Sequence, residues 1–199
     1  MSYDISLTDP VTHKTLTCET PHFMHGGTYA LNGTTELWLN VTCNYSDYYR
    51  YEKEDGSKTS IHDINNMSAL ESIPVLENLI EKINKEYKDE NGEWKTARRK
   101  RHVVYDENGY RTKMDVFEAV RGNIKYTVKT EEFDISEGDT SNYWYATAAN
   151  ALIPLYQLIT MAKMRPDGVW DVSCWILSKI GEWKNPFPFY YRQTKKYIV

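Results

Sequence analysis

The sequence lacks every motif that would assign a chemistry directly. It contains no P-loop, no GxGxxG before a helix, no serine elbow, no zincin motif and no kinase signature set. Its three cysteines, Cys18, Cys43 and Cys174, form no CxxC pair, and an odd number argues against a disulfide framework. The function must therefore be inferred from where polar and aromatic residues fall in the fold.

Long apolar runs and a strong charge of one sign are also absent. No run approaches the length of a membrane-spanning helix, and no apolar signal segment opens the chain. The formal net charge of −4 disfavours general binding to a nucleic acid backbone. We therefore expect a cytoplasmic protein that binds neither membranes nor nucleic acid.

Aromatic residues, in contrast, are abundant. They make up 14% of the 199 residues, with 16 Tyr and 6 Trp, while the apolar (41%) and charged (26%) shares are those of an ordinary folded protein. Aromatic side chains join a large contact area to a polar tip, which suits ligand pockets and interfaces as well as cores. The length predicts a single domain over residues 1–199.

The most informative stretch runs from His22 to Tyr45, where a glycine-punctuated segment leads into one long strand predicted over 35–46. Side chains alternate between the two faces of a strand, so the apolar face is a core face and the other face is polar. This pattern predicts that Leu39 and Val41 are buried and that Asn40 points the opposite way. The polar face comprises Glu36, Trp38, Asn40, Thr42 and Asn44.

The rest of the chain predicts an α+β fold, in which an antiparallel β-sheet packs against two main helices, with an inserted β-meander. Turn signals and apolar periodicity set the expected elements. In the first part of the chain they are a hairpin over 2–19 with its turn at Asp9-Pro10 and its end at Thr20-Pro21, and a helix over 73–87 capped by Ser72, because Pro74 disfavours an earlier start at Ser68. The insertion 88–138 holds a three-stranded meander, with strands over 102–106, 110–117 and 124–133 and a turn at 107–109. The last part holds a helix over 141–164 kinked or broken near Pro154, a stop at 165–168, a short helix over 171–180, and an aromatic extended tail over 182–199.

Four phrases of the chain resemble a family of small phage and prophage proteins of unknown function. They are YDISLTDPVT, GGTYALNGTTELWLNVTCNY, ALESIPVL and MAKMRPDGVW. The resemblance covers about 2–85 and 140–170, which implies that 88–138 is an insertion. It implies a phage accessory protein acting in the bacterial host cell. By analogy, such a protein counters host defence by sequestering a nucleotide messenger or by binding a host protein.

Groups suited to a small polar ligand gather near the predicted strand. The turn segments Gly26-Gly27-Thr28 and Gly33-Thr34-Thr35 offer backbone amides to an anion, and Trp38 with Asn40 offers stacking and hydrogen bonds to a base or sugar. The candidate ligand-binding residues are His25, Gly26, Gly27, Thr28, Tyr29, Thr35, Glu36, Trp38, Asn40 and Trp170.

Other interpretations of the sequence stay open beside this one. His22 and His25 lie in a loop with no third ligand at a suitable spacing, so we expect no metal and no cofactor. Glu36 and His25 are the acid–base pair if the protein is an enzyme acting on a nucleotide or glycan. The insertion and the tail are the contact surfaces if it inhibits a host protein, and a homo-oligomer also stays open. The basic run Lys95–Arg101 is either a contact for phosphate or a solvated surface.

Overall fold

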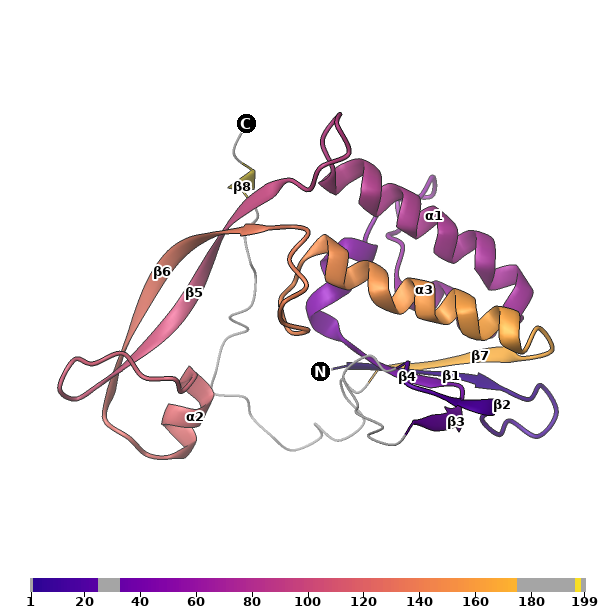
Figure 1. Cartoon of the computed structure of the whole chain (residues 1–199), viewed down its shortest axis with the longest axis horizontal. Coiled ribbons are helices and arrows are strands. Elements are labelled where there is room, and N and C mark those ends of the chain that lie inside the picture. Colours follow the sequence, from indigo (N-terminus) through magenta and orange to yellow (C-terminus); the bar gives the residue numbers. More distant parts are fainter. Residues whose placement is uncertain (1, 25–32, 175–195, 198–199) are drawn as a thin grey trace. The chain divides into compact units, whose positions relative to one another are not determined.

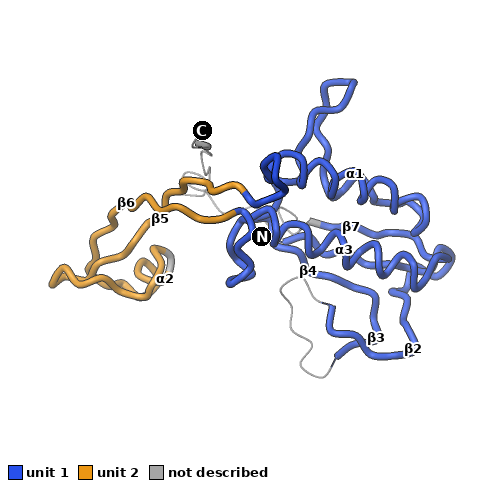
Figure 2. The backbone as a smooth tube through the Cα atoms, turned by 45° about the horizontal axis from the view of Figure 1, so that its top comes forward, with its two compact units in different colours: residues 1–94, 137–184 blue, residues 95–136, 185–199 orange. Residues whose placement is uncertain are grey.

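The computed structural model describes residues 2–24, 33–174 and 196–197, which fall into two compact units (Figure 2). Unit 1 comprises residues 1–94 and 137–184, and unit 2 comprises residues 95–136 and 185–199. Helices and antiparallel strands both occur, which confirms the predicted α+β class. None of the helices in the described ranges is long and apolar enough to span a membrane.

Unit 1 is built on a three-stranded antiparallel sheet with two helices on one face (Figure 1). β1 (Ser2–Thr8) lies between β4 (Trp38–Thr42) and β7 (Val169–Cys174). α1 (Ala69–Tyr87) and α3 (Ala148–Met164) pack on the inner face, where the alternate apolar residues of each strand join one buried hydrophobic cluster. The predicted packing of a sheet against two main helices is confirmed.

The predicted alternation in β4 is confirmed at its centre. Leu39 and Val41 have no exposed surface, while Asn40 lies on the opposite face and donates from Nδ2 to Asp4 Oδ1 at 2.6 Å. Leu37 is also fully buried, so the inner face follows period two from Leu37 to Val41.

The single strand predicted over 35–46 is wrong at both ends. β3 (Thr34–Glu36) pairs with β2 (Thr17–His22) in a separate sheet, and that strand runs past the stop expected at Thr20-Pro21. Beyond Thr42 the chain turns into the 3₁₀ helix η1 (Cys43–Tyr49), because the Thr42 hydroxyl accepts a hydrogen bond from the amide of Asn44 at 3.2 Å. Three tyrosines of η1 are then buried at helical spacing: Tyr45, Tyr48 and Tyr49.

α1 begins earlier than predicted. Ser68 and Glu71 form a capping box, and the amide of Ala69 donates to the carbonyl of Gly168 at 2.8 Å, so the helix starts at Ala69 rather than Ile73. Pro74 lies inside the helix. The capping box satisfies the first amides, and this outweighs the one hydrogen bond that Pro74 cannot donate.

α3 begins later than predicted and is not broken at Pro154. It starts at Ala148, where the Thr147 hydroxyl caps the amide of Asn150 at 3.3 Å. The buried carboxylate of Glu137 accepts from the amide of Ala148 at 2.9 Å, so a residue from outside the helix fixes its first turn. The helix ends at Met164, which confirms the stop at 165–168.

β7 replaces the first part of the helix predicted over 171–180, whose residues 175–180 lie outside the described ranges. Trp170 and Val172 alternate into the core, as a strand requires. The outer edge of β7 is covered by residues 65–68: the amide of Asn66 donates to the carbonyl of Trp170 at 2.9 Å, and that of Trp170 to Met67 at 3.0 Å. This pairing fixes β7 between two backbone segments.

Unit 2 is built on a long ribbon of two strands, to which a short third strand from the C-terminal region is added, rather than on the predicted meander (Figure 1). β5 (Thr96–Asp106) pairs along its whole length with β6 (Tyr126–Ser136), and the turn predicted at 107–109 is confirmed. The strand predicted over 110–117 is wrong, because Asp115 and Glu118 form a capping box that starts the helix α2 (Val116–Arg121). Within the predicted tail, the structure describes β8 (Lys196–Tyr197), which pairs with β5.

The basic run Lys95–Arg101 lies along β5 and faces acidic residues of β6. Side chains on opposite strands meet in ion pairs: Arg98 with Asp134 at 3.0 Å, Lys100 with Glu132 at 3.2 Å, and Arg101 with Glu131 at 3.2 Å. These pairs use the cations within the ribbon, so the run does not form an uncompensated basic patch.

Candidate functional site

The face of the β4–β1–β7 sheet opposite the helices carries the polar residues of all three strands. We call it the outer face. Strand register places its side chains in two rows, each crossing the sheet from β4 through β1 to β7. The rows are Trp38–Ser6–Asp171 and Asn40–Asp4–Ser173.

Hydrogen bonds fix Asn40 on this face, where it lies on the edge strand β4. Its side-chain amide donates to Asp4 Oδ1 at 2.6 Å and to the Ser2 hydroxyl at 2.8 Å. The Tyr143 hydroxyl lies against the edge of β4, where it accepts from the amide of Thr42 at 3.1 Å and donates to the carbonyl of Asn40 at 3.3 Å. The strand that carries Trp38 and Asn40 is therefore held on both edges.

Buried tyrosines of η1 anchor the chain directly after β4. Burial raises the pKa of the Tyr45 and Tyr49 hydroxyls, so both stay protonated across the physiological range. Tyr45 donates to the carbonyl of Tyr143, and Tyr49 donates to the carbonyl of Ala151 at 2.9 Å. These bonds connect η1, which directly follows β4, to the segment before α3 and to α3 itself.

The chemistry of the outer face suits a ligand with an aromatic ring and hydrogen-bond donors. Trp38 is partly buried and presents an indole beside Ser6. Asp4 and Asp171 supply carboxylate oxygens, which accept hydrogen bonds from hydroxyl and amino groups. The two rows contain no Lys or Arg, so they match a base or a sugar better than a phosphate.

Of the residues predicted from sequence, the structure brings Trp38 and Asn40 together on the outer face. Thr35 and Glu36 lie in β3, which belongs to the other sheet, and the Glu36 carbonyl accepts from His22 Nε2 at 2.8 Å. Trp170 is 1% exposed and donates its indole N–H to the Ser72 hydroxyl at 2.7 Å. The remaining predicted residues lie outside the described ranges: His25, Gly26, Gly27, Thr28 and Tyr29.

Sequence reasoning missed Asp4, Ser6 and Asp171. The alternation of Asp4 and Ser6 with apolar neighbours is visible in the sequence, and it places both on a polar face. What the sequence does not show is that β1 lies between β4 and β7, which brings these residues beside Trp38. Asp171 was missed for a second reason: the sequence predicted a helix over 171–180, whereas this residue lies in β7.

A metal site has no support among the residues that the structure describes, where no group of three or more His, Cys, Asp or Glu side chains is placed to hold an ion. Comparison of the chain with protein-family models, with curated proteins and with solved structures finds no match.

Proposed function

We propose that this protein binds and sequesters a small nucleotide-derived signal of host immunity, without catalysis, as a phage accessory protein. The observation that carries the proposal is Trp38, an aromatic side chain among carboxylate, amide and hydroxyl groups on a sheet face opposite the helices. Stacking on an aromatic side chain, with polar groups at its sides, is a common way to hold a base.

The polar groups around Trp38 fit the base and sugar of such a ligand. Asp4 and Asn40 lie in the row next to Trp38, two residues further along the strands, and their mutual hydrogen bond holds them in place. Exocyclic amines and ribose hydroxyls donate hydrogen bonds, and the carboxylate oxygens accept them. The phosphates need a different set of groups, and the amides of Gly26, Gly27 and Thr28 are our candidates from the sequence.

Calorimetric titration with candidate nucleotide messengers tests the proposal. Removal of a stacking indole costs roughly 1–3 kcal/mol of binding free energy, so Trp38→Ala should weaken binding by about tenfold to a hundredfold. Trp144→Ala is the control, because Trp144 is 56% exposed and belongs to neither row of the outer face. Equal affinity of Trp38→Ala and wild type would remove the proposed site.

Product analysis of the same titrations separates sequestration from catalysis. Under sequestration the ligand is recovered intact, and Glu36→Gln and His25→Ala change its affinity only modestly. Under the enzyme alternative both substitutions abolish turnover. Mass spectrometry of small molecules that co-purify with the protein from infected, defence-positive cells would identify the ligand, and a processed product would overturn the non-catalytic proposal.

One observation favours the second candidate, an inhibitor that binds a host defence protein. α3 and the segment before it expose large apolar side chains, which in soluble proteins often mark protein contacts. Ile153 (42% exposed) and Tyr156 (52%) lie one turn apart on α3. Under this candidate Ile153→Asp abolishes protection of the phage and Trp38→Ala preserves it, the reverse of the outcome expected for sequestration.

A further inference from the structure

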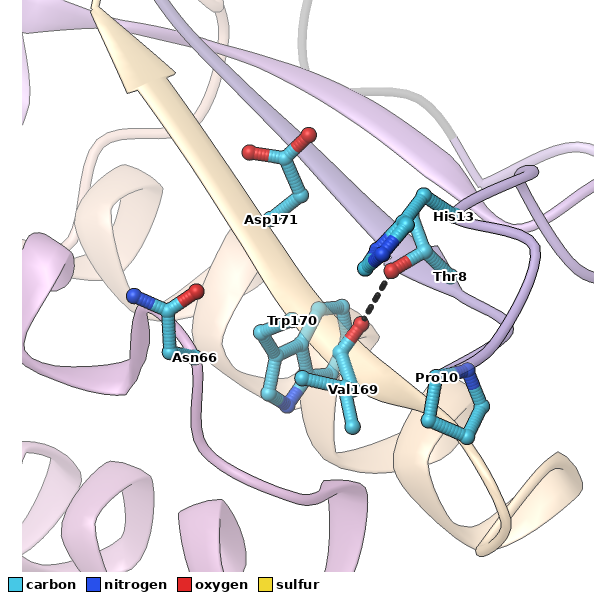
Figure 3. Close-up of a pocket in the computed structure, with 7 residues that line it drawn as sticks. All are labelled: Thr8, Pro10, His13, Asn66, Val169, Trp170 and Asp171. Atoms are coloured by element: carbon cyan, nitrogen blue, oxygen red, sulfur yellow. Dashed lines mark hydrogen bonds between the residues drawn. The ribbon is translucent and has the colours of Figure 1, made fainter.

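An open pocket of about 360 Å³ adjoins the outer face at the β7 end of the Trp38–Ser6–Asp171 row. Figure 3 shows Thr8 and His13 on one side of β7 and Asn66 on the other, with Asp171 on the strand between them. The pocket is lined by Thr8, Pro10, His13, Asn66, Val169, Trp170 and Asp171.

Two residues of this pocket have an unusual backbone conformation. His13 has a φ of 56° and Asn66 a φ of 62°, and Asn123 in unit 2 is the one other non-glycine residue with positive φ in the described ranges. Glycine is the residue that adopts this region freely, so a side chain at such a position is retained at some cost. Two of the three cases line one pocket, and such positions are enriched at ligand sites.

The surrounding backbone holds both residues in place. The amide of His13 donates to the carbonyl of Asp9 at 2.9 Å, within a turn that the Asp9 carboxylate closes by accepting from the amide of Thr12 at 2.7 Å. The amide of Asn66 donates to the carbonyl of Trp170 at 2.9 Å. Hydrogen bonds therefore hold the backbone of the pocket on both sides of β7.

Three side chains of the pocket have unused hydrogen-bonding capacity. In the described part of the chain, no hydrogen bond or ion pair engages the carboxylate of Asp171, the amide of Asn66 or the imidazole of His13. The Thr8 hydroxyl, in contrast, is used, because it donates to the carbonyl of Val169 at 2.8 Å. A carboxylate accepts two hydrogen bonds side by side, and an amide both donates and accepts.

This combination matches a pair of neighbouring hydroxyl groups. Each hydroxyl donates to an oxygen of Asp171 and accepts from the Asn66 amide or from the His13 ring. A phosphate is disfavoured beside Asp171, since the two negative charges repel each other at short distance. Trp38 and Asp171 are each paired with Ser6 from opposite sides, so their backbones lie two strand spacings apart, roughly 10 Å. A nucleoside spans a comparable length.

We propose that this pocket is the ribose subsite of the nucleotide site. Asp171 accepts hydrogen bonds from the 2′- and 3′-hydroxyls of the ribose, while the base of the same nucleotide stacks on Trp38. Asn66 and His13 form the walls that orient the sugar. The inference rests on the proposed function, because Trp38 supplies the stacking half of the site.

The test is a calorimetric titration with the four ribonucleoside 5′-monophosphates and their 2′,3′-dideoxy counterparts. NMR follows the indole N–H of Trp38 and the side-chain amide of Asn66 in each titration. We expect at least one ribonucleotide to shift both signals, and its dideoxy counterpart to bind tenfold or more weakly while still shifting the Trp38 signal. Asp171→Asn should remove most of this preference for ribose.

Glycine variants keep the test separate from effects on folding. Asn66→Gly and His13→Gly delete the side chains at positions where glycine adopts the observed backbone without strain. Both should keep wild-type melting temperatures, and Asn66→Gly should reduce the preference for ribose over dideoxyribose. Asn123→Gly, at a left-handed position in unit 2, is the matched control and should leave binding unchanged.

The outcomes distinguish the two proposals. Equal affinity for ribose and dideoxyribose nucleotides, with the Trp38 signal shifted by both, overturns the ribose subsite and leaves the proposed function standing. The ribose subsite is also overturned if Asp171→Asn weakens the binding of ribose and dideoxyribose nucleotides equally. That outcome would place an amino group of the base, rather than the ribose, against the carboxylate, and it leaves the proposed function standing. If none of the eight nucleotides shifts the Trp38 signal, the subsite and the nucleotide-binding function both fail.

Discussion

At the scale of single residues, a buried carboxylate fixes the first turn of α3. Glu137 has no exposed surface and directly follows β6 in the chain. Its Oε2 accepts from the amide of Ala148 at 2.9 Å and from the Tyr48 hydroxyl at 2.7 Å, and its backbone carbonyl accepts from the amide of Ala149 at 2.9 Å. One residue thus satisfies the first amides of α3 and a core tyrosine together.

Loss of this carboxylate should be costly. Glu137→Ala leaves the amide of Ala148 buried without its acceptor, and hydrogen bonds to a charged group are worth about 1.5–3 kcal/mol each, so we expect a loss of about 3 kcal/mol in the free energy of unfolding. Glu137→Gln keeps an acceptor oxygen and should lose about 1 kcal/mol. Urea unfolding measures both, with exposed Glu90→Ala as the control. Equal midpoints for Glu137→Ala and wild type would contradict the capping role.

At the scale of elements, the alternation of apolar residues predicted correctly which side chains of β4 are buried. Period two correctly placed Leu39 and Val41 in the core, because burial on one face fixes the alternation of a strand. The same pattern gave a wrong prediction after Thr42, where the hydroxyl of that residue caps a 3₁₀ helix with three buried tyrosines. An apolar face of this kind is also what a continued strand would present. Tyrosine suits either structure, so the sequence does not separate them.

Capping boxes explain the errors at the starts of α1 and α2. The spacing Ser68 to Glu71 is visible in the sequence, but Pro74 argued against a helix beginning there. The spacing Asp115 to Glu118 starts α2 within a segment whose apolar residues also fit a strand. In each case a reciprocal pair of side-chain hydrogen bonds at the first turn determined the boundary. The outer-face site was only half predictable, because strand order depends on contacts distant in sequence.

The stability of the β5–β6 ribbon should depend on pH, because carboxylates take part in its cross-strand pairs. The hydrogen bond from Arg98 lowers the pKa of Asp134, and the hydrogen bond from Tyr105 lowers the pKa of Glu131. A lowered carboxyl pKa means that the stabilisation is fully present above the ordinary values of 3.8 for Asp and 4.5 for Glu. It is lost as the pH falls through the lowered pKa.

Single substitutions should move these two pKa values independently. Arg98→Gln should raise the pKa of Asp134 towards 3.8 and leave Glu131 unchanged, while Tyr105→Phe should raise the pKa of Glu131 towards 4.5 and leave Asp134 unchanged. Titration of the side-chain carboxyl carbons by NMR measures both. High salt should diminish the Arg98 effect, because both side chains of that pair are exposed. A shift of both carboxyls in either variant would show that the pairs do not act separately.

At the scale of the whole molecule, the hydrophobic cluster lies in unit 1, and unit 2 buries a much smaller set of its own residues. The sequence predicted an insertion over 88–138, whereas the compact unit begins at Lys95 and its first part ends at Ser136. The difference matters, because Trp94 and Gly138 belong to unit 1: a Cβ added to Gly138 would lie 2.3 Å from Cδ1 of Trp94. Lys88 also lies over the Trp94 ring, with its Nζ 4.6 Å from the ring centroid.

These boundaries predict which deletion leaves a folded core. Thr96 and Ser136 face each other in the ribbon, so replacing residues 97–135 with Asn-Gly should close a two-residue hairpin. This deletion keeps Trp94, Glu137 and Gly138, and we expect a cooperative melt within a few degrees of wild type, with the nucleotide binding that we propose at Trp38 preserved. Replacing 88–138 removes Glu137 together with the Trp94–Gly138 contact and should lower the melting temperature markedly. Calorimetric melting compares the two deletions, and a broad, non-cooperative melt of the shorter one would show that unit 1 needs the ribbon to fold.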